Sequence, residues 1–462
     1  MLGSQRIPGR RRGGARLLTL ALAATLAACG GGGGGGEDTQ TPVGCSLPER
    51  KGWLAQYMDE WYLWNRLVQR PDVSADLALD DYFQALLFKG NAEIPSDRWS
   101  GSEPTATYER YYGEGATMGY GLAVAGIEVA GQADQPLYVR LVEPDSDAGR
   151  QGVQRGDRVV SLNGQPTEGP GGLVARNDFD LLVAEREGQT LTVVLRNGAG
   201  VERTVTLTAR IFTLTPVRES RVLTSPAGRR VGYVMINQMI SQALAPLDAA
   251  FAEFQRQGVQ ELVLDLRYNG GGLVSTAATV GSYVAGARAA GQTFAALRYN
   301  ERRAPFNDQV FTFSRPSAAA GLARVYVLTG PRTCSASEQV INALRPFVDV
   351  VRVGGTTCGK PVGFLPQSDT CGTTWSAVNF ESFNVSNEGR YYDGFTPTCP
   401  APDAWSQPLG AAGDTLLAAA MTHADTGRCP AAGGGPVKPL QWRASRAAAG
   451  AEPGERQDMI PR

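Results

Sequence analysis

The chain has 462 residues, which is enough for two or three domains with substantial cores. Its 44 basic and 45 acidic residues leave a net charge of −1, so the total charge gives no reason to expect nucleic-acid binding. It contains one histidine, His423, and no Cys-x-x-Cys pair, which makes a metal site the weaker explanation of its seven cysteines.

The N-terminus has the pattern of a targeting segment. Several arginines precede an apolar run over residues 17–28, which is too short to span a bilayer. The run ends in Leu26-Ala27-Ala28 followed by Cys29, which resembles the bacterial lipobox. That resemblance implies a lipoprotein signal peptide over residues 1–28 and a lipid on Cys29. An ordinary cleaved secretory signal with an incidental cysteine is the alternative.

Residues 29–44 contain an unbroken glycine run and predict a flexible tether behind the lipid anchor. No aspartate follows Cys29, and the lipoprotein sorting rule then implies the outer membrane of a bacterial envelope, facing the periplasm. Six cysteines remain without Cys29. An even number in an exported chain predicts up to three disulfides, with the pairing left open.

Residues 45–116 are predicted to form a small helical region. Leu54, Tyr57, Met58, Trp61 and Trp64 recur at helical spacing, and a second such pattern covers residues 79–87. An aromatic stripe of this kind usually belongs to a hydrophobic core, so we assign it no ligand.

Residues 117–208 show short strands separated by turn signals, which predicts a β-rich domain. Gly119-Tyr120-Gly121-Leu122 resembles the carboxylate-binding loop of a PDZ domain. The segments 144–149 and 152–164 resemble the helix and strand that follow this loop. The resemblance implies that a peptide adds as a strand to a sheet edge while loop N–H groups hold its terminal carboxylate.

From residue 209 onward, strands alternate with helices, which predicts a largely parallel α/β core over residues 209–430. The predicted elements are strands at 232–236, 262–266, 325–328, 348–353 and 378–385 and helices at 243–257 and 414–422. A further helix is predicted to open at Ser335 and to present Val340, Ile341 and Leu344 on one apolar face. Residues 431–462 are rich in proline, glycine and alanine, and we predict that they are disordered.

Ser335 and Lys360 are the candidate catalytic residues. Ser335-Ala336-Ser337-Glu338 opens a predicted helix after a buried strand, and the next strand returns the chain, with Lys360, to the same edge of the sheet. The structural alternative for the serine is a capping box in which Ser335 and Glu338 satisfy free backbone groups. The chain has only four lysines, at 51, 89, 360 and 438, so a lysine at a preset offset from a serine is uncommon.

These motifs together resemble the carboxyl-terminal-processing (tail-specific) serine peptidases, over roughly residues 45 to 425. The shared features are the helix start at Ser335, the lysine 25 residues later, and the strand end Asp265-Leu266-Arg267-Tyr268-Asn269-Gly270-Gly271-Gly272. The resemblance implies a crotonase-like α/β fold with a PDZ domain inserted before the peptidase core. It also implies a Ser/Lys pair with Ser335 as nucleophile and Lys360 as general base, supported by Glu338 and Thr357, without a metal or organic cofactor.

Peptide hydrolysis also requires fixed donors for an oxyanion, and Gly271, Gly272 and Ala336 are the candidates for them. Glycine lets the backbone approach a substrate, and Ala336 N–H lies at the positive end of a helix. The alternatives for the glycine run are a strand-ending turn or a phosphate cradle. No Gly-Lys-Ser/Thr follows the run, which disfavours nucleotide binding.

A lysine acts as a base only when it is neutral, so its pKa has to fall from about 10.4 by roughly 2 to 3 units through burial. Apolar neighbours of Lys360 agree with such a pocket, although Gly359 and Pro361 also permit an ordinary exposed lysine in a turn. The family usually places a glutamine four residues after the lysine, and Phe364 stands there instead. Gln367 is the nearest substitute. The departure allows another orienting group, a slow enzyme, or a fold kept without catalysis.

The sequence therefore predicts a lipid-anchored envelope serine endopeptidase whose PDZ domain recruits unstructured C-termini of proteins or peptides. A non-catalytic, peptide-binding lipoprotein with a degenerate peptidase core is the alternative. A serine/histidine pair using His423 is a minor third option. Cys334 is adjacent to Ser335, and we expect it in a disulfide that pins this turn rather than in a papain-like pair.

Overall fold

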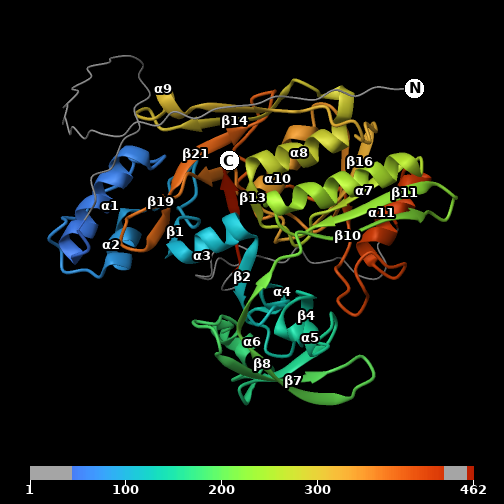
Figure 1. Cartoon of the computed structure of the whole chain (residues 1–462), viewed down its shortest axis with the longest axis horizontal. Coiled ribbons are helices and arrows are strands. Elements are labelled where there is room, and N and C mark those ends of the chain that lie inside the picture. Colours follow the sequence, from blue (N-terminus) through green and yellow to red (C-terminus); the bar gives the residue numbers. More distant parts are fainter. Residues whose placement is uncertain (1–43, 431–454, 462) are drawn as a thin grey trace, which may run out of the picture. The chain divides into compact units, whose positions relative to one another are not determined.

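The computed structural model describes residues 44–430 and 455–461 (Figure 1). Cys29, the predicted signal peptide and the glycine tether lie outside these residues. None of the helices in the described ranges combines the length and the hydropathy that a membrane span requires.

The N-terminal region confirms both predicted helices, and the aromatic stripe is buried in the main core as expected. Phe83 and Trp375 pack edge to face at 4.9 Å, which joins this region to the α/β part of the chain after residue 209. A disulfide between Cys45 and Cys371 makes the same connection covalently. The elements are α1 (Leu47–Trp61), α2 (Leu79–Leu86), β1 (Gly101–Pro104), α3 (Thr105–Glu109) and η1 (Arg110–Glu114).

The next segment folds around its own hydrophobic core into a sheet of order β3-β4-β5-β7-β8. Its elements are β3 (Leu122–Val124), α4 (Gly126–Val129), β4 (Leu137–Val142), α5 (Asp147–Arg150), β5 (Arg158–Leu162), β6 (Gln165–Pro166), α6 (Leu173–Arg176), η2 (Asp180–Leu182), β7 (Thr190–Arg196) and β8 (Glu202–Thr208). The chain enters and leaves through β2 (Ala116–Gly119) and β9 (Arg210–Thr213), which pair with each other.

The central sheet of the part after residue 209 has the order β10-β11-β12-β16-β17-β22. Neighbours from β11 to β22 are parallel, as predicted, and β10 joins as an antiparallel edge. The strands are β10 (Val217–Thr224), β11 (Arg230–Ile236), β12 (Glu261–Asp265), β16 (Arg324–Thr329), β17 (Asp349–Gly354) and β22 (Cys399–Pro400).

The two faces of this sheet are covered by different helices (Figure 1). Val325 and Val327 of β16 face a core shared with α7 (Leu244–Arg256), α8 (Val274–Ala285) and α10 (Ala336–Leu344). Tyr326 and Leu328 face the other core, which α11 (Thr415–Thr426) covers. Because successive side chains of a strand point to opposite faces, the two cores are separated by the sheet itself.

The prediction of a mostly parallel sheet describes only this central sheet. Antiparallel pairing builds a second sheet, β15-β14-β21-β18, and a third, β1-β20-β19. Of their strands, the sequence predicted only β21, as part of the strand at residues 378–385. These strands are β14 (Thr293–Tyr299), β15 (Gln309–Thr312), β18 (Val362–Phe364), β19 (Gln367–Ser368), β20 (Thr373–Ser376) and β21 (Val378–Phe383).

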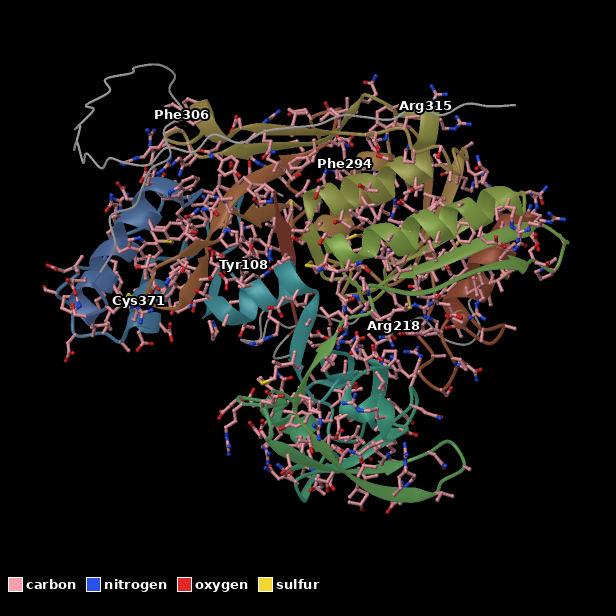
Figure 2. The ribbon with its side chains drawn as sticks, viewed as in Figure 1. Tyr108, Arg218, Phe294, Phe306, Arg315 and Cys371 are labelled. Atoms are coloured by element: carbon pink, nitrogen blue, oxygen red, sulfur yellow. A yellow bond between two sulfur atoms is a disulfide. The ribbon has the colours of Figure 1, made fainter. Side chains whose placement is uncertain are left out.

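A short helical connection completes the second sheet. Helix α9 (Ala304–Asn307) lies between β14 and β15, and the 3-10 turns η3 (Ser241–Ala243) and η4 (Gly286–Arg288) flank α7 and α8. Phe294 on β14 is buried, whereas Phe306 on α9 is 83% exposed; both are labelled in Figure 2.

The prediction that residues 431–462 are disordered is wrong for residues 455–461. Asp458–Ile460 forms β23, which pairs in parallel with β13 (Gly271–Leu273). The physical reason is local: Met459 and Ile460 are 0% and 1% exposed, and their burial outweighs the polar, glycine-rich average of the tail.

Candidate active site

Ser335 is the N-cap residue of α10 and has φ 59° and ψ −117°, a backbone conformation that residues other than glycine rarely adopt. The residue is buried, and its Oγ has no hydrogen-bond partner among the described residues. Strained backbone and an unpaired buried hydroxyl both cost stability, and such costs concentrate at functional sites.

The capping alternative describes only half of this arrangement. Ser335 and Glu338 are placed as a capping box, and the Glu338 carboxylate accepts the backbone N–H of Ser335 at 3.0 Å. The other half is weak, because the Ser335 Oγ makes no hydrogen bond of normal geometry within the described ranges. Capping therefore explains the glutamate better than it explains the serine.

The loop before Ser335 is fixed against the end of β12. Cys334 N–H donates to Asn269 O at 3.1 Å, and Thr333 Oγ1 donates to Leu266 O at 2.8 Å. Asn269 is itself held, since its Nδ2 donates to Ile236 O at 3.0 Å. Parallel strands place their carboxyl ends at one edge, which is why these three loops meet.

Glu338 joins the serine and the lysine. One carboxylate oxygen accepts the backbone N–H of Ser335 at 3.0 Å and the backbone N–H of Lys360 at 2.8 Å. The other oxygen accepts Gly359 N–H at 2.8 Å and Thr357 Oγ1 at 2.5 Å. The two backbone nitrogens thus lie within two hydrogen-bond lengths of each other, and Thr357 contacts the same carboxylate.

Glu338 is completely buried, and burial raises the pKa of its carboxyl group. Hydrogen bonds from Thr357 and from the backbone of Lys360 oppose this shift because they favour the ionised form. The carboxylate therefore serves as a fixed acceptor for neighbouring groups.

A disulfide closes the same site covalently. Cys334 and Cys358 are bonded, with 5.2 Å between their Cα atoms, and they flank Ser335 on one loop and Lys360 on the other. The sequence predicted a disulfide at Cys334, and the structure supplies its partner. The remaining described cysteines form the Cys45–Cys371 and Cys399–Cys429 disulfides.

Replacing both Cys334 and Cys358 with alanine is expected to lower kcat/KM for peptide hydrolysis by about 10- to 100-fold, because small misplacements of catalytic groups are costly. Steady-state kinetics on the double variant measures the loss. The double variant Cys399→Ala/Cys429→Ala is the matched control, and an equal loss in both would contradict a specific role for the first bond.

Lys360 is completely buried. Its Nζ donates a hydrogen bond to Gln457 O and lies 3.7 Å from the centre of the Phe364 ring. Burial lowers the pKa of the amine to about 7, while the negative charges of Asp458, Asp97 and Glu338 oppose the shift. In half of the molecules the amine is thus neutral near pH 7, as a general base requires.

The pH dependence of activity should follow from this pKa. The amine has to lose its proton to work as a base, so kcat/KM is expected to rise with pH and to level off above about pH 7. A pH series with a neutral peptide substrate measures this limb. A profile that continues to rise to pH 10 would mean that Lys360 keeps the pKa of a free lysine.

The predicted oxyanion donors lie together, but they are not equivalent. Gly271 and Gly272 adopt φ of 105° and 134°, which only glycine adopts without strain. The N–H of Gly271 already donates to Asn269 Oδ1 at 2.8 Å, so its assignment as an oxyanion donor is corrected. In the parallel register of β13 and β23, the N–H of Gly272 is directed at Asp458 O.

Ala336 completes the group of oxyanion donors. A Cβ placed on Gly271 would lie 2.9 Å from Ala336 N and 3.0 Å from Ser335 Cβ. Gly271 therefore packs directly against Ser335 and the first turn of α10. Gly272 N–H and Ala336 N–H remain the candidate oxyanion donors.

Gln367 is not brought to Lys360. It lies in β19, where it pairs with Trp375, and within the described part of the chain the amine of Lys360 donates only to Gln457 O. Phe364 remains at the usual glutamine position, with its ring against the amine. No hydrogen bond between Gln367 and Lys360 in the described residues thus supports the role that was predicted for Gln367.

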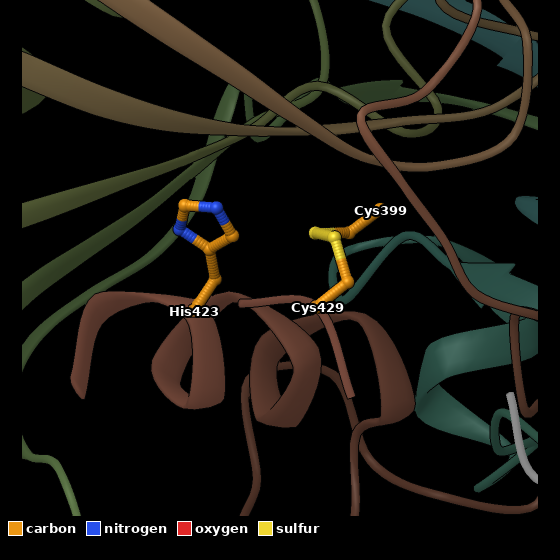
Figure 3. Close-up of side chains that lie close together, drawn as sticks. All are labelled: Cys399, His423 and Cys429. Atoms are coloured by element: carbon orange, nitrogen blue, oxygen red, sulfur yellow. A yellow bond between two sulfur atoms is a disulfide. The ribbon is translucent and has the colours of Figure 1, made fainter. Parts of the chain in front are cut away.

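His423 is remote from Ser335. It lies on α11, with its ring 5.7 Å from that of Tyr326, on the face of the central sheet opposite to α10. Figure 3 shows it beside Cys399 and Cys429. These two sulfurs form a disulfide and are not free thiolates, so the trio does not have the ligands of a zinc site. A catalytic pair of Ser335 and His423 is excluded, because the two residues lie on opposite faces of the central sheet.

The predicted PDZ loop, Gly119 to Leu122, lines a cleft of about 260 Å³. Gly270, Gly271 and Arg332 line the same cleft, so it extends from this loop to the surroundings of Ser335, and residues 455–457 of the tail also line it. Tyr120 is buried, and Gly121 has φ 81°, where a Cβ would collide with Ser146. A peptide in this cleft can contact both parts.

A buried ion cluster supports the glycine loop. The Arg267 guanidinium donates to Asp265 Oδ2 at 2.8 Å, to Asp414 Oδ2 at 2.7 Å and to Asp403 Oδ1 at 3.1 Å. Arg267, Asp265 and Asp414 are each at most 3% exposed. The cluster links the end of β12 to the start of α11, where Asp414 also caps the helix.

Sequence reasoning missed several residues at the site. Asn269 orients the glycine loop, Arg332 contacts both Glu128 and Glu455, and Tyr112 donates to Asp458 at 2.5 Å. The position of Asn269 before three glycines was a usable signal, because asparagine readily bonds its own backbone neighbours. The other contacts join distant segments and left no local pattern.

Family models match three parts of the chain: the peptidase S41 N-terminal domain at residues 49–101, the PDZ domain at 117–171 and peptidase family S41 at 230–375. The chloroplastic C-terminal processing peptidase of Tetradesmus obliquus is 31% identical over 34% of this chain and 35% of its own length. The carboxyl-terminal-processing protease of Picosynechococcus sp. is 28% identical over 48% and 50%. The alignments thus span about a third to a half of these relatives.

Two solved structures have a similar fold. A putative S41 protease from Bacteroides fragilis matches with a TM-score of 0.63 and 25% identity, over 81% of this chain and 97% of that protein. The photosystem II D1 C-terminal processing protease matches with a TM-score of 0.50 and 21% identity, over 76% and 92%. With its N-terminal helical region, PDZ domain and peptidase domain, the chain belongs to peptidase family S41.

Proposed function

We propose that this protein is a serine endopeptidase in which Ser335 is the nucleophile and Lys360 the general base. The observation that carries the proposal is the Glu338 carboxylate oxygen that accepts the backbone N–H groups of both residues. The buried Ser335 Oγ, which no described residue pairs, and the lowered pKa of Lys360 support the same assignment. In keeping with the family resemblance, we also propose a crotonase-like topology for the core.

In the proposed reaction, neutral Lys360 takes the hydroxyl proton as Ser335 Oγ attacks the carbonyl carbon of a peptide bond. The carbonyl oxygen becomes negative and is met by Gly272 N–H and Ala336 N–H, which need no reorganisation. The protonated lysine then gives its proton to the leaving amine, and the acyl-enzyme forms. Water, deprotonated by the same lysine, releases the acid and regenerates the serine.

The amine of Lys360 is oriented without the family's usual glutamine. The ring of Phe364, whose centre lies 3.7 Å from Lys360 Nζ, packs against one side of the amine and orients it in place of the glutamine. An aromatic ring stabilises a cation that lies over it. Phe364 therefore also favours the protonated form of Lys360, which exists after the amine has taken the proton from Ser335 and before it gives that proton to the leaving amine. The enzyme is expected to be competent but slower than relatives that have the glutamine.

The PDZ domain is proposed to recruit unstructured C-termini of proteins or peptides. The cleft shared by Gly119 to Leu122 and the glycine loop supports this role, because one extended chain can reach both walls. We further propose lipidation of Cys29 and an outer-membrane location facing the periplasm, on the lipobox resemblance alone. Metabolic labelling with radioactive palmitate tests it, and equal labelling of the Cys29→Ser variant would refute it.

Cleavage of fluorescein-labelled casein, an unfolded protein, tests the peptidase proposal. The Ser335→Ala variant is expected to release no fluorescence above background. Ser337→Ala is the matched control, since Ser337 lies in the same helical turn, is buried, and also has an Oγ without a hydrogen-bond partner in the described chain. Equal cleavage by Ser335→Ala and the wild type would overturn the assignment.

The same experiment distinguishes the peptide-binding alternative. If neither the wild-type protein nor the Arg456→Glu variant, in which the ion pair with Glu103 is broken, cleaves casein, but the protein binds peptides that end in a free carboxylate, the non-catalytic lipoprotein is the better description. Fluorescence anisotropy with such a peptide and with its amidated form measures the binding. Tighter binding of the peptide with the free carboxylate would assign the binding to the PDZ loop.

A further inference from the structure

The end of the chain lies in its own peptidase site. Strand β23 pairs with β13 in the register Gly271 with Asp458, Gly272 with Met459 and Leu273 with Ile460. Asp458 N–H donates to Gly270 O at 3.0 Å. Addition of a peptide strand to an exposed backbone edge is a common way of binding extended peptides. The tail thus uses the glycine loop as a bound peptide would.

The catalytic groups contact the backbone of this strand. Lys360 Nζ donates to Gln457 O. A Cβ on Gly271 would lie 2.2 Å from Asp458 O, as well as beside Ala336 N and Ser335 Cβ. Gln457 O therefore occupies the proposed base, and Asp458 O faces Gly272 N–H in the strand register and lies against Gly271, beside the first turn of α10. Another peptide would need the same positions.

Charged side chains anchor the tail on the N-terminal side of Gln457. Arg456 makes a bidentate ion pair with Glu103 of β1 and lies 4.3 Å from the ring centre of Tyr111. Glu455 pairs with Arg140 of the PDZ domain and with Arg332, three residues before Ser335. Such bidentate pairs fix direction as well as position.

Apolar side chains anchor the tail on the C-terminal side of Asp458. Met459 belongs to the main core, and Ile460 packs with Tyr112, Leu273 and other residues in a smaller core. Both side chains are buried, so leaving the site would expose them to water. A covalently attached strand also competes at a high effective concentration.

We propose that residues 455–461 are an inhibitory strand, tethered to the enzyme, which fills the substrate cleft and has to leave before another peptide can enter. This inference rests on the proposed peptidase function. In the docked state Lys360 is hydrogen-bonded to the tail while Ser335 Oγ has no partner among the described residues, so the base does not engage the nucleophile. Substrate entry and activation of Ser335 both require the tail to move.

A charge reversal at the anchor tests the proposal in the full-length chain. Arg456→Glu breaks the pair with Glu103 and places like charges together, so the initial rate of casein cleavage is expected to rise at least about fivefold. The double variant Glu103→Arg/Arg456→Glu restores the pair and should return the rate to that of the wild type. Neither residue belongs to the catalytic group. An unchanged rate in Arg456→Glu would overturn the proposal.

A synthetic peptide with the sequence of residues 455–461 gives a second measurement. It should inhibit Arg456→Glu competitively, and a peptide of the same composition in scrambled order should not. If no variant cleaves casein but the labelled peptide binds Arg456→Glu and not the wild type, the tail inference holds and the peptidase proposal fails. Variants that cleave casein and are not inhibited by the peptide would support the peptidase proposal and overturn the tail inference.

Mass spectrometry of the purified wild-type chain adds a third arm. An intact C-terminus agrees with an inhibitory strand. A wild-type chain that is shortened within residues 455–461, together with an intact Ser335→Ala chain, would overturn the proposal, because the strand would then be a consumed substrate.

Discussion

Replacing Lys360 with methionine is expected to reduce kcat/KM by about 10²- to 10⁴-fold while making the protein more stable. The loss follows from removing the general base. The gain follows from the low pKa of the buried amine, about 7 in the folded protein against 10.5 for an unperturbed lysine. Each unit of that difference corresponds to about 1.4 kcal/mol against the folded state. After allowing for the Phe364 ring and the Gln457 carbonyl, we expect a net gain of roughly 3 kcal/mol at pH 7.

The pH dependence of this gain has a definite sign. Between pH 7 and about 10.5, the unfolded chain binds a proton on Lys360 that the folded chain has largely released, so wild-type stability rises with pH. The advantage of Lys360→Met is full below pH 7 and disappears near pH 10.5. Urea unfolding of both proteins at several pH values measures it. Lys89→Met, at an exposed lysine, is the control. A constant difference across the series would contradict the low pKa.

Replacing Arg267 with methionine is expected to destabilise the folded protein by about 3 to 5 kcal/mol, because it leaves the buried carboxylates of Asp265 and Asp414 without a cation. Burial already raises the pKa of Asp265, and Arg267 opposes that rise. Without Arg267, the pKa of Asp265 in the folded variant should rise further, so Asp265 should take up a proton when the variant folds, and the loss of stability should grow as the pH increases. Thermal unfolding across pH 5 to 8 measures both effects.

Two further variants make the Arg267 experiment specific. Adding Asp265→Asn and Asp414→Asn to Arg267→Met removes the unpaired charges and should recover part of the stability, while the asparagine at 414 can still cap α11. Arg196→Met removes one partner of the exposed Arg196–Glu202 pair and should cost less than about 1 kcal/mol. Equal costs for Arg267→Met and Arg196→Met would show that burial does not strengthen the cluster.

The elements that carry Ser335 could be predicted because their signals are local. The strand before the serine is a short apolar run, and α10 begins with polar residues followed by apolar residues at helical spacing. The offset to Lys360 and the glycine run also survive in the sequence as fixed spacings. Side-chain roles that depend on one contiguous motif were therefore accessible without coordinates.

The remaining features depend on contacts between distant segments. Nothing near Gly271 indicates that its N–H is taken by Asn269, and nothing near Gln367 indicates that β19 directs it away from the lysine. The prediction of disorder for the tail was wrong at residues 455–461 for another reason. Its composition predicts disorder, yet two apolar residues and one well-placed arginine are enough to dock a strand when a backbone edge is available. Composition averages over residues 431–462 hide that exception.

The bond between Cys334 and Cys358 sets when and where the proposed enzyme matures. Cytosolic thiols are kept reduced, so this link forms only in an oxidising compartment. For the envelope protein that we propose, the loops of Ser335 and Lys360 would therefore be locked together only after export, and proteins in the cytosol would not meet the finished enzyme.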